Sequence, residues 1–172
     1  MVNSYITHIL IVIVPLVLSN TLHMFIVKKN LINILNYPIW PYGFGKNKTW
    51  RGILVVVLLN ALFLAIINLL LSPGLDQPFI LGLYLGLAYT LAELPNSFFK
   101  RRWGIAPGGS AGTNNILFHI MDKTDSAFGV LLTYYLLGYT GIRQAAILFF
   151  ISSLVHTFIS IVLVRLKLKS SF

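Results

Sequence analysis

Residues 52–71 read GILVVVLLNALFLAIINLLL, and this stretch decides the fold class. It holds twenty residues without a single charged side chain. Hydrocarbon about 30 Å thick requires roughly 20 apolar residues in a helix. The stretch therefore predicts a helix that crosses a membrane.

The composition of the whole chain points the same way. Hydrophobic residues make up 57% of the 172 residues and charged residues only 10%, whereas soluble domains carry about 25% charged residues. The mean hydropathy is +0.83. A soluble globular domain is therefore excluded, and so is a disordered chain, which would be polar and poor in aromatic residues. Because the chain has no cysteine, a disulfide framework, a thiolate nucleophile and a Cys-ligated zinc site are excluded too.

Further apolar stretches extend this pattern on both sides. We predict an all-α integral membrane protein with five transmembrane helices, forming a single domain over residues 1–172. The predicted spans are residues 5–27, 52–71, 78–99, 115–139 and 142–164. The first span could be a cleaved signal peptide, but it lacks a positive residue before its apolar run and a small-residue cleavage site, so we expect it to be retained.

The fourth span is the least apolar of the five. Its uninterrupted apolar run, residues 126–139, would measure only about 21 Å as a helix, too short to span. Extending the helix back to residue 115 gives a full span and places Asp122, Lys123 and Asp125 inside it. We adopt the longer helix. If the span began at residue 126 instead, both aspartates would lie in an exposed loop.

Basic residues are distributed unevenly between the predicted loops. The chain has 13 Lys and Arg against 4 Asp and Glu, a net charge of +9. One side carries Lys28, Lys29, Lys46, Lys48, Arg51, Lys100, Arg101, Arg102, Arg165, Lys167 and Lys169, and the other only Arg143. Because basic loops stay in the cytoplasm, we predict an outside N-terminus, a cytoplasmic C-terminus and two cytoplasmic loops, near residues 28–51 and 100–114.

Three of the four acidic residues lie in or near predicted spans: Glu93, Asp122 and Asp125. An ionised group there is costly and indicates function. Asp122 and Asp125 are three residues apart, so one helix face presents both carboxylates, and they repel unless a cation lies between them. Mg²⁺ suits them, because it takes oxygen ligands and commonly binds together with substrate phosphates. A structural salt bridge to a neighbouring Lys or Arg is the alternative.

Depth along the helices predicts that these acids share a pocket. Asp122 lies about seven residues into the fourth span, or about 10 Å along its axis, and Glu93 lies at a similar depth in the third. We expect one polar pocket below the cytoplasmic headgroups. Residues 46–51 and 100–102, here called the first and second basic segments, would rim it and attract an anionic nucleotide.

The two basic segments suit phosphate binding. The second segment is Lys100-Arg101-Arg102, in which Arg offers bidentate donors and Lys a point charge. The first lies in GFGKNKTWRG, residues 43–52, where glycines and cations precede a helix N-terminus, a favourable place for an anion. Alone, the first segment could instead be a positive-inside flank, and the second a topology signal or a contact with anionic lipid. The histidines give weaker evidence, and the sequence does not identify a partner for His23 or His156. Together, cations, acids and burial in the membrane indicate a site where a nucleoside triphosphate meets a lipid phosphate.

Three strings of the sequence resemble the CDP-archaeol synthase family: GKNKTWRG (45–52), ELPNSFFKRRWGIAPG (93–108) and DKTD (122–125). Pro15 and Asn20 match a weaker element of the same family. This family consists of small integral membrane cytidylyltransferases that are akin to CDP-diacylglycerol synthases. The resemblance implies the reaction of CTP with a lipid phosphate, of the archaeal ether type or a related one, to give CDP-lipid and diphosphate.

The resemblance also implies roles for individual residues. Asp122, Asp125, Lys100 and Arg101 would be catalytic, and Glu93, Asp122 and Asp125 would hold Mg²⁺. The substrates would be bound by Asn20, Lys48, Thr49, Arg51, Asn96, Ser97, Lys100, Arg101, Arg102 and Lys123. The expected partners are CTP and a lipid phosphate, with no nucleic acid, at a site that faces the cytoplasm from the plasma membrane. The oligomeric state stays open.

Two other functions remain compatible with these residues. A CTP-dependent lipid kinase has similar metal and phosphate requirements, but it would release CDP instead of diphosphate. A non-enzymatic membrane protein that binds anionic lipids would turn over no CTP at all.

Overall fold

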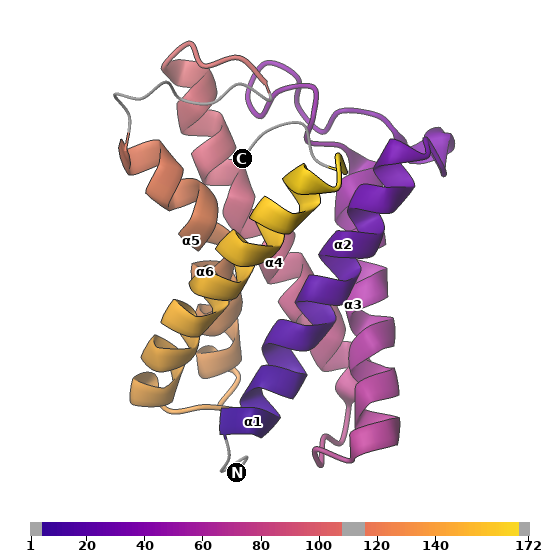
Figure 1. The fold of residues 1–172 in the computed structure, drawn as a ribbon, viewed down its shortest axis with the longest axis vertical. Helices are drawn as coiled ribbons and strands as arrows, with labels where there is room; N and C mark the ends of the chain where they lie inside the picture. Colours follow the sequence, from indigo (N-terminus) through magenta and orange to yellow (C-terminus); the bar gives the residue numbers. More distant parts are fainter. Residues whose placement is uncertain (1–4, 108–115, 169–172) are drawn as a thin grey trace.

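The computed structural model describes residues 5–107 and 116–168 (Figure 1). Apart from one isolated antiparallel bridge between Pro38 and Thr49, all regular structure in these two ranges is helical. The elements are α1 (Tyr5–His8), η1 (Ile9–Ile13), α2 (Val14–Lys28), η2 (Asn33–Leu35), α3 (Trp50–Leu71), α4 (Pro78–Arg102), α5 (Ile116–Leu136) and α6 (Ile142–Arg165). The all-α prediction is confirmed.

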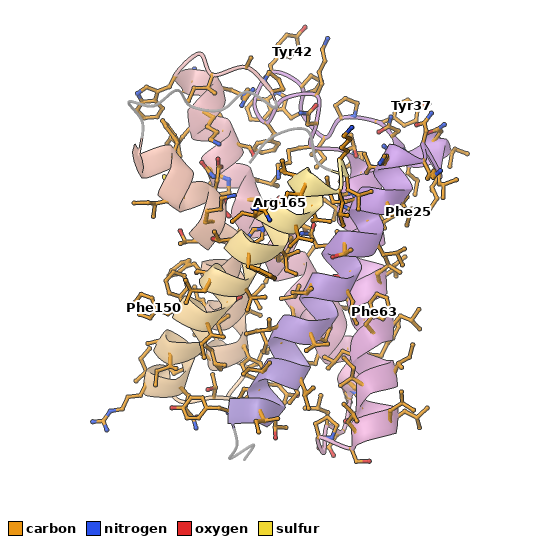
Figure 2. All side chains as sticks on the ribbon, viewed as in Figure 1. Phe25, Tyr37, Tyr42, Phe63, Phe150 and Arg165 are labelled. Carbon is orange, nitrogen blue, oxygen red and sulfur yellow. The ribbon has the colours of Figure 1, made fainter. Side chains whose placement is uncertain are left out.

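Four helical segments are long and apolar enough to cross a membrane: Tyr5–Lys28, Trp50–Leu71, Pro78–Arg102 and Ile142–Arg165. Their outer faces expose large apolar side chains such as Phe25 and Phe150 (Figure 2), as helices surrounded by lipid do. Helix α5 is not among these four, although it has 21 residues. It carries three charged side chains, which lower its hydropathy, so a fifth span remains a prediction.

The first of these helices is continuous but not uniform. Residues Ile9–Ile13 form a π-helical turn between α1 and α2, and Pro15 follows directly in the first turn of α2. Proline has no amide hydrogen and cannot complete the regular hydrogen-bond pattern. A wider turn at the same place is one way in which helices accommodate such a break.

Local capping sets the ends of two helices that matter for the site. Thr49 is extended, and its Oγ1 accepts a hydrogen bond from the Gly52 amide at 3.2 Å, so α3 begins at Trp50, earlier than predicted. Helix α5 ends at Leu136, so the predicted end at residue 139 is wrong. Gly138 has a φ of +78°, and its amide and the next one bond back to the Tyr135 and Tyr134 carbonyls, the usual glycine stop. The predicted start at residue 115 lies outside the described residues.

Helix α4 lies at the centre and packs on both α3 and α5. On its α3 side, Gly82 and Gly86 let the backbones approach closely: a Cβ added at Gly82 would lie 2.5 Å from the Ala61 Cα. The Asn60 Nδ2 donates to the Gly82 carbonyl oxygen at 2.7 Å. Small residues four apart and a polar side chain between helices are typical of packing inside membranes. This contact fixes the helix that carries most of the polar residues discussed below.

A buried cluster closes the bundle at the end that holds α1. The His8 Nδ1 lies 3.0 Å from the Tyr134 hydroxyl of α5, and the Tyr134 ring stacks on Tyr139. Apolar side chains such as Leu85 and Leu148 continue the core towards the middle of the bundle. The polar pocket described below lies nearer the opposite end of the bundle.

At that opposite end, the chain between α2 and α3 folds over the helix termini (Figure 1). Two hydrogen bonds flank the isolated bridge, from the Ile39 amide to the Lys48 carbonyl and from the Trp50 amide to the Tyr37 carbonyl. Gly45 has a φ of +89°, and a Cβ added there would lie 3.1 Å from Pro107. The two loops named in the sequence therefore meet above the helices.

Candidate active site

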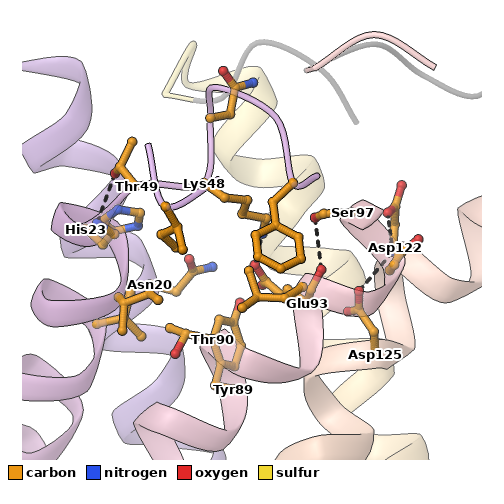
Figure 3. Close-up of a pocket in the computed structure, with 18 of the residues that line it drawn as sticks. Asn20, His23, Lys48, Thr49, Tyr89, Thr90, Glu93, Ser97, Asp122 and Asp125 are labelled. Carbon is orange, nitrogen blue, oxygen red and sulfur yellow. Dashed lines mark hydrogen bonds and ion pairs between the residues drawn. The ribbon is translucent and has the colours of Figure 1, made fainter. Parts of the chain in front are cut away.

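A pocket of about 370 Å³ lies beneath the two loops (Figure 3). Helices α2, α3, α4, α5 and α6 all contribute to it. Its polar and charged lining consists of Asn20, His23, Asn47, Lys48, Thr49, Tyr89, Thr90, Glu93, Asn96, Ser97, Lys100, Arg101, Asp122, Lys123, Asp125, His156 and Ser160. Figure 3 shows Asn20 and His23 of α2 facing Tyr89 and Glu93 of α4 across it. Residues distant in sequence thus meet around one polar space.

The two aspartates lie within α5, so the alternative of a span that starts at residue 126 and leaves them in an exposed loop is wrong. Both are held from α4 by one side chain: the Asn96 Nδ2 donates to Asp122 Oδ1 at 2.7 Å and to Asp125 Oδ2 at 2.9 Å. Asp125 also accepts from the Ser126 amide at 2.6 Å through its other oxygen. The buried amide of Asn96 therefore draws two like charges towards a common point.

Two lysines from different parts of the chain form ion pairs with acidic residues of the pocket. The Nζ of Lys100, one turn after Asn96 on α4, forms an ion pair with Asp122. The Nζ of Lys48, in the loop before α3, forms an ion pair with Glu93. The salt-bridge alternative considered for the aspartates is therefore present for one of them. Each lysine neutralises a carboxylate in a partly buried setting, where charges interact more strongly than in water.

Arg101 presents a different electrostatic situation. It lines the pocket, and its Nε and Nη1 atoms are buried without a hydrogen-bond partner among the described residues. A buried donor on a charged group is costly when it is unsatisfied. An anion in the pocket that accepted from this guanidinium would remove that cost.

Two of the predicted phosphate-binding arginines do not line the pocket. Arg51 is 5% exposed and turns to the preceding loop, where its Nη1 donates to the Leu31 carbonyl at 3.0 Å and to Asn33 Oδ1 at 3.2 Å. Arg102 is exposed and lies over the Phe98 ring, 5.2 Å from its centroid. These contacts stabilise the loop and the end of α4 instead.

The remaining predicted residues line other parts of the pocket. Asn20 lines it from α2 and Thr49 caps α3 at its edge. Ser97 donates to the Glu93 carbonyl of its own helix at 2.9 Å, which leaves its oxygen as an acceptor. The Lys123 Nζ donates to the Ser160 hydroxyl at 3.3 Å and so links α5 to α6.

Sequence reasoning missed His23, Tyr89 and His156 as members of the pocket. Their spacing carried a signal: His23 is three residues after Asn20, and Tyr89 is four residues before Glu93, so each shares a helix face with a predicted residue. His156 lies with its ring centroid 6.2 Å from that of Tyr89. Figure 3 shows His23 beside Thr49, and Tyr89 on the side of the pocket away from the loop that carries Lys48.

The aspartates suit Mg²⁺ in the way that substrate-dependent sites do. Mg²⁺ is usually bound by one or two carboxylates, with substrate phosphates and water completing its shell. Asp122 and Asp125 supply such a pair. Among the parts of the chain that the structure describes, no three His, Cys, Asp or Glu side chains form one metal-binding group. The structure therefore does not bring Glu93 into one ligand set with the aspartates.

The fold and this pocket define a class: an all-helical protein with membrane-type helices around a pocket of paired carboxylates and cations. A family model described as "CarS-like: CDP-archaeol synthase" matches residues 43–172. The chain belongs to the CDP-archaeol synthase family, so the resemblance drawn from its motifs is confirmed.

A curated relative agrees with this assignment. The chain is 36% identical over 95 residues to a CDP-archaeol synthase of Staphylothermus marinus. The match covers 55% of this chain and 49% of that protein, so the chain spans about half the length of the curated relative it matches. No solved structure matches the chain significantly.

Proposed function

We propose that this chain transfers the cytidylyl group of CTP to a membrane lipid phosphate, giving CDP-lipid and diphosphate. Its family supports the reaction class. The observation that carries the proposal is the pocket itself, which collects Asp122 and Asp125 beside Lys48, Lys100 and the half-buried guanidinium of Arg101. This combination suits two phosphate-bearing substrates that must be brought together despite their mutual repulsion.

The proposed reaction needs no protein nucleophile. A non-bridging oxygen of the lipid phosphate attacks the α-phosphorus of CTP, the bond from that phosphorus to the bridging oxygen breaks, and diphosphate leaves with the electron pair. Such chemistry depends on positioning and charge neutralisation. Arg101 would bind phosphate oxygens with two donors, while Lys48 and Lys100 would exchange their carboxylate partners for phosphate oxygens.

Asp122 and Asp125 would hold Mg²⁺, with Asn96 orienting both carboxylates from α4. When bound, Mg²⁺ supplies neutralisation of the attacking and leaving oxygens. Glu93 would join this pair only when Lys48 turns to a phosphate, because the ion pair occupies its carboxylate until then.

We also propose that α5 is a fifth span and that the pocket opens to the cytoplasm at the plasma membrane, with the N-terminus outside. The basic residues of the loops around the pocket support this orientation. Because the chain has no cysteine, single introduced cysteines can test it. In intact cells, an impermeant thiol reagent should label Asp76→Cys, and Lys46→Cys only after permeabilisation. The reverse pattern would invert the topology.

The function is tested by product analysis of the purified protein with labelled CTP, Mg²⁺ and a panel of ether- and ester-linked lipid phosphates. We expect CDP-lipid and diphosphate in equal amounts. Release of CDP with a phosphorylated lipid would identify a lipid kinase instead, and absence of CTP turnover with every lipid would leave a lipid-binding protein.

The aspartate pair provides a matched control for this experiment. Asp125→Asn keeps the side-chain shape but removes a charge, so we expect turnover to be lost at all Mg²⁺ concentrations while the protein stays folded. Asp76→Asn makes the same change in an exposed loop and should leave turnover intact. Equal rates for the two variants would remove Asp125 from the site.

A further inference from the structure

The loop between α2 and α3 has an unusual composition. Residues 30–45 contain no charged side chain, and nine of these sixteen residues are Leu, Ile, Phe, Trp or Tyr, whereas loops in water are ordinarily polar. We call residues 31–37 the apolar segment. Four of its large apolar side chains are between 46% and 80% exposed: Leu31, Ile32, Ile34 and Tyr37. Such an exposed group indicates a surface that binds a partner.

Backbone hydrogen bonds fix how the apolar segment leaves α2. The Leu31 amide donates to the Ile26 carbonyl at 3.0 Å. The Asn30 amide donates to the Val27 carbonyl at 3.0 Å, and Asn30 has a φ of +54°. These are the two bonds and the left-handed residue of a Schellman cap, which turns the chain away from the helix axis. In Figure 1 the chain after α2 accordingly lies at the side of the bundle, near the level of the helix end.

Arg51 holds the backbone on both sides of a strained residue of this segment. Ile32 has a φ of +56°, which is an outlier for a β-branched side chain. The Arg51 Nη1 donates to the carbonyl of Leu31 and to the side chain of Asn33. Strain of this kind persists only where surrounding contacts impose it, and it is often found at functional sites. The fold therefore holds the apolar segment in place against a backbone preference.

The apolar segment follows directly on the apolar outer face of α2. Leu18, Leu22 and Phe25 are spaced four and three apart, so they share one helix face, and all three are exposed. Lys29 lies four residues after Phe25 and places an exposed cation at the end of this face. The helix is long and apolar enough to cross a membrane, and a cation near the end of such a helix attracts anionic headgroups.

We propose that the apolar segment inserts among the lipid headgroups beside the end of α2 and anchors the loop to the bilayer surface. The occupant is identified by composition and continuity. Apolar and aromatic side chains beside a cation are typical of segments at a membrane interface. A protein partner from solution would not require a surface that continues the outer face of a membrane-type helix. The anchor goes beyond the proposed reaction and does not depend on it.

The anchor is connected to the pocket through the isolated bridge. At the end of the apolar segment, the Tyr37 carbonyl accepts from the Trp50 amide at 3.0 Å. The Ile39 amide donates to the Lys48 carbonyl at 2.9 Å, and the Lys48 side chain forms an ion pair with Glu93. Anchoring the segment therefore restrains the part of the loop that places Lys48 over the pocket.

Because the chain has no cysteine, single cysteines can compare two positions of this loop. Ile34 is 80% exposed and Tyr42 is 90% exposed, so the protein alone gives a label at either position similar surroundings. Figure 2 shows Tyr42 above the bundle and Tyr37, in the apolar segment, to its side. Ile34→Cys and Tyr42→Cys are labelled with the same polarity-sensitive fluorophore. Each is placed in vesicles of phosphatidylcholine and phosphatidylglycerol, with or without lipid brominated near the headgroup end of its chains.

We expect the brominated lipid to quench most of the emission at residue 34 and little of the emission at residue 42. The emission at residue 34 should also lie at shorter wavelength, because the label is removed from water. Equal quenching at the two positions, or no quenching at residue 34, would overturn the anchor. This measurement requires no CTP turnover, so its outcome is independent of the proposed reaction.

The link between the anchor and Lys48 is tested with unlabelled variants, and this part rests on the proposed function. Ile34→Asn and Tyr42→Asn each replace an exposed apolar side chain by the same polar one, so neither removes buried packing. In vesicles, Ile34→Asn should lower kcat/KM for CTP severalfold, whereas Tyr42→Asn should leave it unchanged. Equal kcat/KM for the two variants, with strong quenching at residue 34, would refute the link and leave the anchor standing.

Discussion

The first and second basic segments look alike in sequence, since each contains three cations within six residues. In the structure they share one feature: a lysine from each, Lys48 or Lys100, forms an ion pair with a carboxylate of the pocket. The first segment reaches the pocket from a loop and the second from a helix. The two lysines thus make the same kind of ion pair, but Lys100 is held by a helix and Lys48 by a loop.

The arginines of the two segments differ more. The Arg51 Nη1 is turned away from the pocket and donates to two loop oxygens, whereas Arg101 lines the pocket and finds no partner for its buried Nε and Nη1 among the described residues. Arg102 is one residue further along α4 and lies on Phe98 outside the pocket. Successive residues of a helix point about 100° apart, so Lys100 and Arg101 can both face the pocket while Arg102, the next residue, points away from it.

Within the two basic segments, the largest effect is expected at Lys100, the more rigidly held lysine, which is only 8% exposed. Lys100→Met should lower kcat/KM by about 100-fold or more, because a preorganised donor is lost from the proposed reacting centre and Asp122 loses its ion-pair partner. Steady-state kinetics of CDP-lipid formation measure this. Lys48→Met should have a smaller effect, since Lys48 is on a loop and is more exposed.

Lys28→Met is the control for this comparison, because Lys28 is an exposed lysine outside the pocket. It should leave kcat/KM unchanged. If Lys48→Met lowers kcat/KM as much as Lys100→Met does, a position on a helix gives Lys100 no advantage over a lysine in a loop. The expected difference between the two segments is then wrong.

Arg101→Lys comes next in expected size. The ammonium keeps the charge but cannot make a two-donor contact with a phosphate, so kcat/KM should fall by about tenfold, the loss of roughly 1.4 kcal/mol. Arg102→Lys is the matched control one residue away and should be nearly neutral. Equal kinetics for both variants would reduce the second segment to a topology signal.

The helices could be predicted from sequence because hydropathy and length decide them. The predicted spans 78–99 and 142–164 differ by at most three residues from α4 and α6. The start of α3 and the end of α5 also differ from the predicted ends, at 50 instead of 52 and at 136 instead of 139, because capping at Thr49 and Gly138 depends on backbone conformation that hydropathy does not encode.

The site could be predicted only in part. Spacing on one helix placed Asp122 and Asp125 on a common face, and the structure brings them to one amide. Spacing could not indicate that Asn96 on α4 supplies that amide, or that Lys48 reaches Glu93, because both contacts depend on how separate segments pack. Arg51 illustrates the limit: its position in a family-like motif suggested phosphate, and its loop contacts became visible only in three dimensions.

Arg51→Ala should therefore affect stability more than catalysis. The Leu31 carbonyl and the Asn33 side chain lose their donor, and the free energy of unfolding should fall by about 1 kcal/mol, as for a typical lost hydrogen-bond partner. Thermal unfolding measures the change, and the KM for CTP should rise by less than threefold. A tenfold loss of kcat/KM at unchanged stability would restore Arg51 as a phosphate ligand.

The smallest effect is expected for Arg102→Ala. The side chain is exposed, and its described contact is the face of Phe98, so its removal should lower the free energy of unfolding by less than about 1 kcal/mol and leave kcat/KM unchanged for every lipid phosphate. The measurement is steady-state kinetics in vesicles with and without anionic lipid. Because Arg102 does not line the pocket, a loss confined to anionic vesicles would assign it to the membrane surface, where a cation attracts anionic headgroups. A loss of equal size in neutral vesicles would instead place it on a substrate, and helical phase would then no longer explain how the second segment divides its charges.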